Sequence, residues 1–326
     1  MAKKNTNLVK LRILITGGAG AVGSSLANNL VAKNGIKVDV LDNLDSGYEL
    51  NLLKNRNLRF FLGSVLDERM LDYLSSRDYD YIFHFAARFA NQTSVEFPKT
   101  DFDVNSTGTL KMLEFASQQK KLKKFVYSSS SCVYGSTENQ VMNEDDKLKP
   151  DTPYAISKLS AEHYVDFFRR HYQVPANSLR LFNIYGSNEW PGKYRNVIPN
   201  FVHLALNNQD ITVMGDGSDT RDFTYIDDAL EMMLGVAFDD ANNGETYNIG
   251  SGIETRIIDL AEAVIKGTGS KSQIVFIPKR DWDTISRRRA CIKKISQYKN
   301  GKHCRLEKGL KTVFNFVDTL QPLINS

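Results

Sequence analysis

Two side chains in the middle of the sequence have the types and spacing needed to move a proton. Tyr154 and Lys158 are separated by one turn of a predicted helix, so the phenol and the ammonium share a face. A phenol has a pKa of about 10, but a nearby positive charge favours the phenolate. The serines of Ser128–Ser131 end a predicted strand, and a serine there can bond both the phenol and a substrate oxygen. The pattern indicates that a hydroxyl is deprotonated while a hydride leaves the same carbon.

A glycine-rich turn near the start of the sequence is typical of a dinucleotide site. Gly17, Gly20 and Gly23 follow the apolar run Ile13–Thr16 and lead into a predicted helix. Such glycines allow a tight turn and a close approach to a pyrophosphate, and the helix N-terminus supplies free N–H groups. Asp42 follows about 20 residues later, where a carboxylate accepts from the ribose hydroxyls of NAD and repels a 2′-phosphate. The pattern predicts NAD as the cofactor.

The elements that must position these groups alternate between apolar strands and amphipathic helices. Buried strands separated by helices predict a parallel sheet that is covered on both faces, which is a Rossmann-like, doubly wound α/β fold. The predicted strands are 12–16, 37–42, 59–62, 81–85, 124–129 and 178–182, and the predicted helices are 23–33, 105–119 and 153–171.

The composition changes near residue 186, where clusters of Gly, Pro and Asn begin. We expect a NAD-binding Rossmann domain over residues 1–185, which also receives about 222–250. Residues 186–326 are expected to form a smaller C-terminal substrate-binding lobe. Ligands tend to bind in the crevice at the ends of such strands, so the site is expected between the two parts.

Composition excludes several classes of protein. The chain has 326 residues, of which 41% are apolar and 25% are charged, as in an ordinary globular protein. A net charge of +4 does not demand nucleic acid as a partner. The three cysteines favour a reducing compartment, and no apolar stretch is long enough for a signal peptide or a membrane span. We therefore expect a cytoplasmic protein with no membrane partner.

The motifs together resemble one family. The chain is similar to the extended short-chain dehydrogenases/reductases, and within them to the NAD-dependent nucleotide-sugar epimerases and dehydratases, nearest in type to the UDP-glucose (UDP-galactose) 4-epimerases. The resemblance covers almost all of residues 11–316. The blocks that carry it are Gly17–Gly23, Asp42–Leu44, His84–Ala87, Asn105, Ser128–Gly135, Pro153–Lys158, Arg180–Gly186, Gly215–Gly217, Arg221–Asp228 and Tyr247–Gly250.

The resemblance implies a role for each matching residue. Tyr154 would be the base, Ser130 its hydroxyl partner, and Lys158 would hold the nicotinamide ribose and lower the Tyr154 pKa. Residues that would bind NAD are Gly17, Gly20, Ala21, Val22, Gly23, Asp42, Asn43, Ser64, Val65, Phe85, Ala86, Ala87, Asn105, Ser128, Tyr154 and Lys158. Residues that would bind a nucleotide-sugar substrate are Ser130, Asn183, Asn196, Val197, Arg221 and Arg280, with the two arginines on the diphosphate.

The resemblance also implies a homodimer. In this family, helices equivalent to 105–119 and 153–171 pair with those of a second copy into a four-helix bundle. The second helix needs an apolar outer side for this, and Ile156, Phe167 and Phe168 are the candidates.

Departures from the family pattern narrow the reaction. Resembling 4,6-dehydratases carry Asp-Glu where this chain has Ser131 and Cys132, and resembling UDP-glucuronate decarboxylases carry Glu where Cys132 stands. Both reactions are therefore disfavoured. A catalytic Cys132 would indicate a C3/C5 epimerase, but that reaction needs a second acid or base where this chain has Asn196. We therefore expect Cys132 to pack as a small apolar residue. Ser64 replaces an Asp that often meets the adenine.

A 4-epimerase of the UDP-hexose type fits these observations best. A C4 dehydrogenase or keto-sugar reductase with net NAD(H) turnover uses the same three catalytic groups and stays open, as does a non-catalytic binding module. Arg287–Arg289 fit either a uronic acid carboxylate or a solvated basic surface. Residues 280–311 hold eleven Lys or Arg against three Asp or Glu but few aromatics, so we expect no nucleic-acid partner. The histidines lack metal-ligand spacing, so we expect no metal, and His84 should support a strand end.

Overall fold

A computed structural model describes residues 11–324, with the exception of 90, 138 and 284. The first ten residues of the expected NAD-binding domain and the last two of the expected smaller lobe therefore lie outside the described part of the chain.

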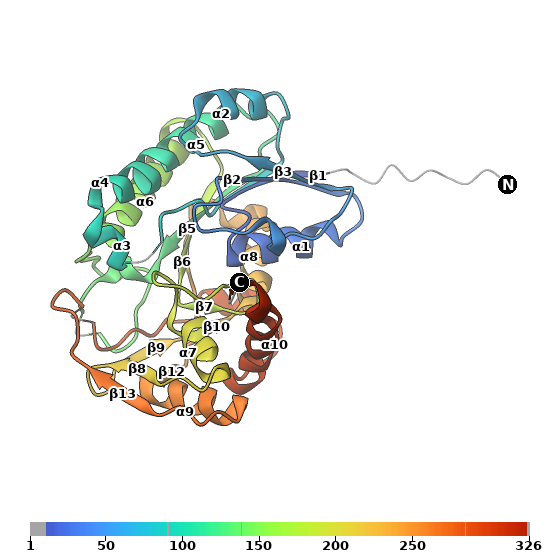
Figure 1. The fold of residues 1–326 in the computed structure, drawn as a ribbon. Coiled ribbons are helices and arrows are strands. Elements are labelled where there is room, and N and C mark those ends of the chain that lie inside the picture. The colour runs from blue at the N-terminus through green and yellow to red at the C-terminus, as the bar shows by residue number, and fades with distance from the viewer. Residues whose placement is uncertain (1–10, 90, 138, 284, 325–326) are drawn as a thin grey trace.

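A seven-stranded sheet forms the centre of the larger lobe (Figure 1). All of its strand pairs are parallel, and their order is β11-β6-β5-β4-β1-β2-β3. The order reverses between β1 and β4, and ligands bind at such reversals, beyond the carboxyl ends of the strands. The strands are β1 (Leu11–Thr16), β2 (Ile36–Asp42), β3 (Leu58–Leu62), β4 (Tyr81–His84), β5 (Lys124–Ser130), β6 (Ala176–Leu181) and β11 (Thr246–Ile249). The predicted Rossmann-like fold is confirmed.

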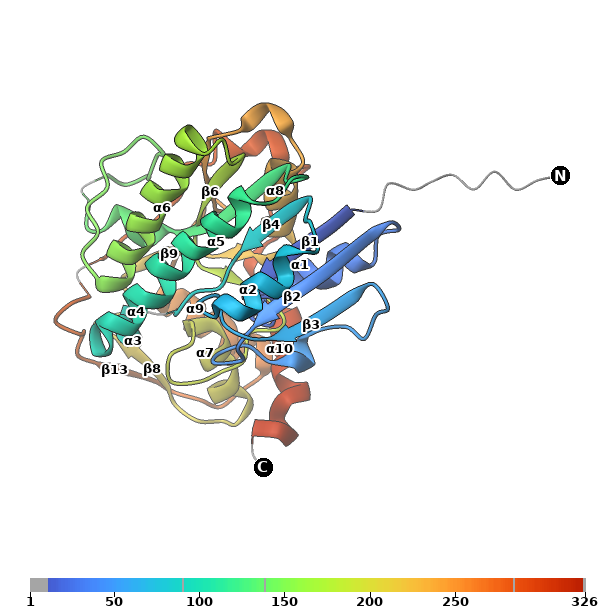
Figure 2. The same cartoon turned by 90° about the horizontal axis from the view of Figure 1, so that it is seen from above.

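Helices cover both faces of this sheet (Figures 1 and 2). On one face, α1 (Ala21–Val31) and α8 (Ile226–Ala237) share an apolar cluster with Ile13 and Ile15 of β1. On the other face, α2 (Glu68–Ser75), α5 (Gly108–Ser117) and α6 (Pro153–His171) pack around the intervening Leu14. Successive residues of a strand point to opposite faces, so β1 has to be apolar along its length.

The segments beside α5 and α6 depart from the predicted regular helices. The predicted helix over 105–119 is observed as α5, preceded by a wide π-helical turn over Asp103–Thr107 and by two short helices, α3 (Asn91–Glu96) and α4 (Pro98–Phe102). The predicted helix over 153–171 matches α6, which begins with Pro153 after the capping side chain of Thr152. The capped start fixes the first turn of α6, where Tyr154 stands.

The smaller lobe has its own apolar core. Helices α7 (Val197–Leu206), α9 (Ile257–Thr268) and α10 (Leu306–Ile324) pack against β8 (Ile211–Met214), which pairs with β13 (Ile274–Ile277). Two further strand pairs join β7 (Ile184–Tyr185) to β10 (Thr224–Tyr225) and β9 (Thr220–Asp222) to β12 (Glu254–Arg256). Between β10 and β12 the chain returns to the larger lobe, where it forms α8 and β11.

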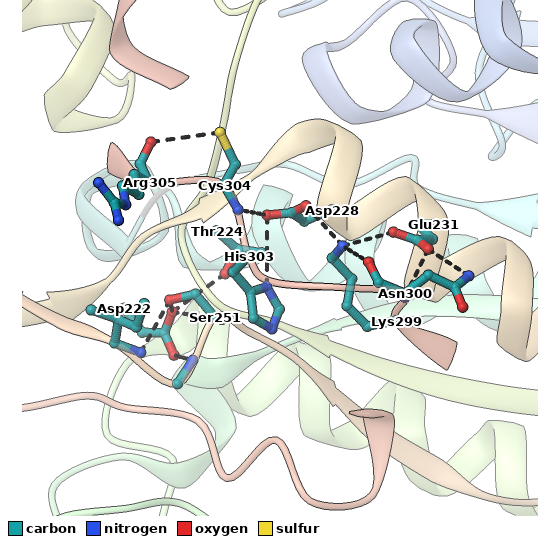
Figure 3. A network of polar contacts seen from close by, with 12 residues as sticks. Asp222, Thr224, Asp228, Glu231, Ser251, Lys299, Asn300, His303, Cys304 and Arg305 are labelled. Atoms are coloured by element: carbon teal, nitrogen blue, oxygen red, sulfur yellow. Dashed lines mark hydrogen bonds and ion pairs between the residues drawn. The ribbon is translucent and has the colours of Figure 1, made fainter. Parts of the chain in front are cut away.

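Two buried aspartates tie the C-terminal segment across the molecule (Figure 3). Asp222 is fully buried and accepts hydrogen bonds from the backbone N–H groups of Ser251, Gly252 and Ala290, at 2.9, 2.9 and 3.1 Å. Asp228 accepts from the Cys304 N–H at 2.6 Å and forms an ion pair with Lys299. Charge-assisted bonds of this kind are strong when buried. They hold residues 290–304 against both lobes.

Candidate active site

A cavity of about 430 Å³ opens at the carboxyl ends of the sheet strands and is closed by the smaller lobe. Its floor comes from the loops after β1, β2, β4 and β5. Its far wall comes from residues 181–196 and from Arg221, Arg280 and Arg288. This is the crevice that the sequence predicts, at the point where the strand order reverses.

The glycine-rich turn forms the nucleotide end of this cavity. Gly17 has a φ of +67°, and a Cβ added there would lie 2.5 Å from the Ala86 nitrogen. A Cβ on Gly23 would lie 2.3 Å from the Gly17 carbonyl oxygen. Both contacts are with backbone and are too short for any side chain. Gly20 caps α1 without a side-chain bond, so the first amides of the helix, from Ala21 and Val22, are free to bind an anion.

Asp42 stands at the cavity wall at the end of β2. Its Oδ2 accepts from the Ala19 N–H at 2.9 Å and its Oδ1 from the Leu44 N–H at 2.8 Å. A carboxylate oxygen can accept more than one bond, so both oxygens can still meet ribose hydroxyls. A glycine cradle with free helix amides and a carboxylate at this position fits NAD.

The remaining residues assigned to NAD fall into two groups. Most line the cavity, namely Asn43, Ser64, Val65, Phe85, Ala86, Ala87 and Ser128. Asn105 instead lies fully buried behind the wall. Its side-chain oxygen accepts from the Arg88 N–H at 2.8 Å, and its amide nitrogen donates to Asp101 at 3.0 Å. Asn105 therefore shapes the cavity by holding the Arg88 backbone.

The three groups that the sequence predicts to be catalytic meet at the end of β5. Lys158 is buried, and its ammonium donates to the Ser128 carbonyl oxygen at 2.8 Å. Burial lowers the pKa of Lys158 to about 8, although Asp101 and Glu162 oppose the shift. Tyr154 projects from the first turn of α6, and the Ser130 side chain acts to lower the Tyr154 pKa against the larger effect of burial. All three residues line the cavity.

The electrostatics of Tyr154 differ from the prediction. The sequence predicts that Lys158 lowers the Tyr154 pKa, whereas burial raises the pKa of Tyr154 and outweighs the opposing hydrogen bond from Ser130. The Lys158 nitrogen lies 5.9 Å from the centre of the Tyr154 ring and is bonded to Ser128 instead.

His84 supports the strand end as predicted. Its ring nitrogens bond Thr16 and Thr109 at 2.7 and 3.0 Å, and burial lowers its pKa to about 3.

Most residues assigned to the substrate form the opposite end of the cavity. Ser130, Asn183, Asn196, Arg221 and Arg280 all line it. Arg221 is held through a bond from its Nη1 to the Thr220 carbonyl oxygen at 2.9 Å, and Arg280 lies 5.4 Å from the Trp282 ring. Val197 begins α7 and packs against the apolar core of the smaller lobe, away from the cavity lining.

Several polar residues reach the cavity without a signal in the sequence. Arg88 and Asn91 enter from the loop after β4, and Glu189 and Arg195 from the segment before α7. Glu189 accepts from the Asn196 amide at 2.6 Å, and burial raises the pKa of Glu189 to about 7. No motif contains these residues, because each is brought to the cavity by a loop whose path depends on the packing of both lobes.

Cys132 departs from the expected apolar packing. Its sulfur lies 3.2 Å from Nη1 of Arg288 and 3.7 Å from the amide nitrogen of Asn91, and it lines the cavity. The sequence predicts that Cys132 packs as a small apolar residue, but the fold brings two polar donors to its sulfur. One of them, Arg288, is 156 residues away in the chain.

The described residues contain neither a candidate metal-binding cluster nor a membrane-spanning helix. No group of three or more His, Cys, Asp or Glu side chains among them could hold a metal ion. None of the helices they form has the length and apolarity needed to cross a membrane.

Comparison with known proteins identifies the family, but the related proteins catalyse several different reactions. Residues 13–250 match the model of the NAD dependent epimerase/dehydratase family. The chain is 36% identical, over 78% of its length, to a dTDP-D-glucose 4,6-dehydratase of Dictyostelium discoideum, of which the match spans 61%. It is 37% identical to a UDP-N-acetyl-alpha-D-glucosaminuronate decarboxylase of Bacillus cytotoxicus, over 83% of this chain and 84% of the relative.

Solved structures of epimerases superpose over nearly the whole chain. An epimerase from Methanothermobacter thermautotrophicus shares 38% identity with a TM-score of 0.93, over 98% of this chain and 95% of the other. A UDP-glucose 4-epimerase from Thermotoga maritima, solved with UDP-glucose, shares 33% identity with a TM-score of 0.89, over 95% and 100%. From the family match, the fold and the cavity, the chain is a member of the NAD-dependent epimerase/dehydratase family of nucleotide-sugar enzymes.

Proposed function

We propose that the protein is a nucleotide-sugar 4-epimerase of the UDP-hexose type. The observation that carries the proposal is the arrangement at the end of β5. Ser130 and Tyr154 line the same end of the cavity, the Ser130 side chain opposes the rise of the Tyr154 pKa, and the next two positions are Ser131 and Cys132. A dehydratase would need a carboxylic acid there to expel a hydroxyl group, and neither side chain supplies one.

The catalytic groups act on one carbon of the sugar. Tyr154 takes the proton of the C4 hydroxyl, and Ser130 holds the same oxygen. NAD, held by the turn at Gly17–Gly23 and by Asp42, would supply a reversible hydride acceptor for C4. The Lys158 ammonium lies 5.9 Å from the centre of the Tyr154 ring, and its charge would favour the deprotonated phenol without overcoming the effect of burial on the Tyr154 pKa. Burial disfavours the Tyr154 phenolate, and the Ser130 side chain opposes this effect.

Inversion requires that the 4-keto sugar present its other face before the hydride returns. Arg221 and Arg280 would hold the diphosphate, which keeps the nucleotide in place while the sugar ring turns. The epimerase structure with UDP-glucose supports this class of substrate through its fold and its coverage of the whole chain.

We propose that two copies pair through α5 and α6, the two helices expected from the sequence, together with the short α4 that precedes α5. Among the exposed large apolar side chains of these helices are Phe102 at 48%, Ile156 at 50% and Phe167 at 42%, and such a face is typical of an interface. Phe168, a candidate on sequence grounds, is only 5% exposed and packs in the core, because α6 turns that side toward the sheet.

The test of the reaction is product analysis without added cofactor. Purified protein is incubated with UDP-glucose, UDP-N-acetylglucosamine and UDP-glucuronate, and the sugar protons are followed by NMR. We expect conversion of at least one sugar to its C4 epimer, with no consumption of free NAD. Formation of a keto or reduced sugar only when NAD(H) is supplied would replace the proposal with a net oxidoreductase.

The Tyr154→Phe variant ties the conversion to this site. Removal of the phenolic hydroxyl is expected to lower kcat by about 10³-fold or more, since a positioned acid–base group contributes 10²–10⁴-fold. The variant should still purify with NAD, because the cradle at Gly17–Gly23 does not involve the phenol. Unchanged turnover in Tyr154→Phe would show that another group deprotonates the sugar.

A further inference from the structure

The three consecutive arginines at 287–289 have different surroundings. The carbonyl oxygens of Ser286 and Arg288 accept backbone hydrogen bonds from Thr220 and Asp222 of β9, as in a strand ladder, where neighbouring side chains alternate in direction. Arg287 is exposed, and its Nε bonds Glu254 at 2.9 Å. Arg288 is 5% exposed and is the one of the three that lines the cavity. The basic surface is therefore formed by Arg287, whereas Arg288 belongs to the interior of the site.

The backbone around Arg288 is held on two sides. Its carbonyl oxygen accepts from the Asp222 N–H at 3.0 Å, and the next N–H, from Ala290, donates to the Asp222 carboxylate at 3.1 Å. On the other side, Met142 exchanges two backbone bonds of 2.8 Å with Arg289 and Cys291. Asp222 itself is anchored by Ser251 (Figure 3). The position of the Arg288 side chain is therefore set before any ligand binds.

The guanidinium of Arg288 lacks a negative partner in the described part of the chain. Its Nη1 reaches the Cys132 sulfur at 3.2 Å, while its Nε and Nη2 are buried without a hydrogen bond. The nearby Arg221 has the same charge, and Arg288 contributes to the lowering of the Arg221 pKa. A buried cation without a counter-ion is costly, and a guanidinium fork with two free donors matches a carboxylate.

The free donors of Arg288 belong to the same cavity as the catalytic phenol. Arg288 contacts the Cys132 sulfur, Cys132 stands two residues after Ser130, and all three residues line this cavity together with Tyr154. A C4 hydroxyl at Tyr154 has C3 and C5 as its ring neighbours, and C5 carries C6. The diphosphate is on C1, across the ring. Among these neighbours, C6 oxidised to a carboxylate is the group that brings a negative charge to this position.

We propose that Arg288 binds the C6 carboxylate of the sugar, so that the substrate is a nucleoside diphosphate uronic acid. This inference rests on the proposed function, because C4 chemistry is what places C6 beside Arg288. The reaction stays balanced: C4 loses a hydride to NAD⁺ and its hydroxyl loses a proton to Tyr154, and both return. The C5–C6 bond persists, although the 4-keto uronate is a β-keto acid that could lose CO₂.

The first test measures binding, so it does not depend on turnover. UDP-glucuronate and UDP-glucose are titrated by calorimetry into the NAD-loaded Tyr154→Phe protein. We expect UDP-glucuronate to bind about 10- to 100-fold more tightly, the range of a charge-assisted bond pair. Adding Arg288→Met should remove this preference and leave the UDP-glucose affinity within about threefold.

Matched variants separate this role from others. Arg287→Met removes the same side chain one position earlier and should keep the preference, because Arg287 faces Glu254. Arg221→Met should weaken both ligands alike. Arg288→Lys, which retains the charge but not the fork, should give an intermediate preference and serves if Arg288→Met fails to fold. Equal affinities for the two sugars in the parent, or equal loss of both in Arg288→Met, would overturn the proposal.

Turnover of UDP-glucuronate separates the two proposals. Conversion to the C4 epimer with C6 retained supports both. Release of CO₂ with a UDP-pentose would support the carboxylate site and overturn the epimerase. Epimerisation of UDP-glucose at a kcat/KM equal to that of UDP-glucuronate would keep the epimerase and overturn the role of Arg288.

Discussion

The two ends of the cavity are built in different ways. The nucleotide end consists of backbone: the turn at Gly17–Gly23, the amides of α1 and one carboxylate, Asp42. The sugar end consists of side chains from separate segments, among them Cys132, Glu189, Arg221 and Arg288. A backbone cradle tolerates no added atoms but recognises a shared feature, the pyrophosphate. A side-chain wall can be altered one residue at a time, and specificity can change there without loss of the cofactor.

The largest expected effect is at the cradle. Gly23→Ala places a Cβ 2.3 Å from the Gly17 oxygen, a backbone atom that cannot move aside. We expect a protein that purifies without NAD and is destabilised by about 1–3 kcal/mol, the usual cost of overpacking. Absorbance at 260 nm measures the bound cofactor, and a thermal melt measures the stability.

A second glycine serves as the matched control for the cradle. A Cβ on Gly20 would meet the Gly17 oxygen at 3.4 Å, an ordinary contact. The Gly20→Ala protein should therefore have a melting temperature close to that of the parent. If it loses NAD, the added Cβ collides with the cofactor and not with the protein. If Gly23→Ala retained both NAD and the parent melting temperature, the contrast between the two ends would fail.

A smaller effect is expected from pH at the catalytic groups between the two ends. Burial lowers the pKa of Lys158 to about 8, so the ammonium loses its proton as pH rises through this value. We expect kcat/KM to fall above about pH 8, approaching tenfold per pH unit. Steady-state assays from pH 6 to 10 measure this decrease in kcat/KM.

Asp101 provides the control for this decrease. Asp101 raises the Lys158 pKa, so Asp101→Asn should move the fall in kcat/KM to lower pH. If the fall in kcat/KM stays at the same pH in Asp101→Asn, a group other than Lys158 is responsible for it.

At the sugar end, the expected effect is on stability alone and depends on pH. Burial raises the pKa of Glu189 from 4.5 to about 7, so the folded protein favours the protonated acid. The wild type therefore loses stability as pH rises from 4.5 to 7, and the loss is complete above 7. Glu189→Gln, which keeps the acceptor for Asn196, should be about 2–3 kcal/mol more stable than wild type at pH 8.

Denaturant unfolding at pH 4.5 and pH 8 tests this prediction. The two proteins should have nearly equal free energies of unfolding at pH 4.5, where folded Glu189 is protonated and unfolded Glu189 is about half protonated. The exposed Glu49→Gln serves as a control that removes a carboxylate outside the cavity. A Glu189→Gln protein less stable than wild type at pH 8 would show that the ionised acid is held by charge in the fold.

The sequence predicted continuous stretches of the site more accurately than residues whose neighbours come from distant segments. The turn at Gly17–Gly23 and the helix that holds Tyr154 and Lys158 are continuous stretches, so their spacing alone indicates their geometry. The assignments that departed, Asn105, Val197 and Cys132, were transferred by position in a motif. Their surroundings come from other segments, which a motif does not contain.

The sequence by itself determined the α/β class, the NAD cradle and the positions of Ser130, Tyr154 and Lys158, because short-range periodicity and spacing carry that information. Only the tertiary structure decided which of three adjacent arginines enters the cavity. That choice depends on the pairing of residues 286–291 with β9 and Met142. Such pairings join residues far apart in the chain, and a shift of one residue would have turned Arg288 outward.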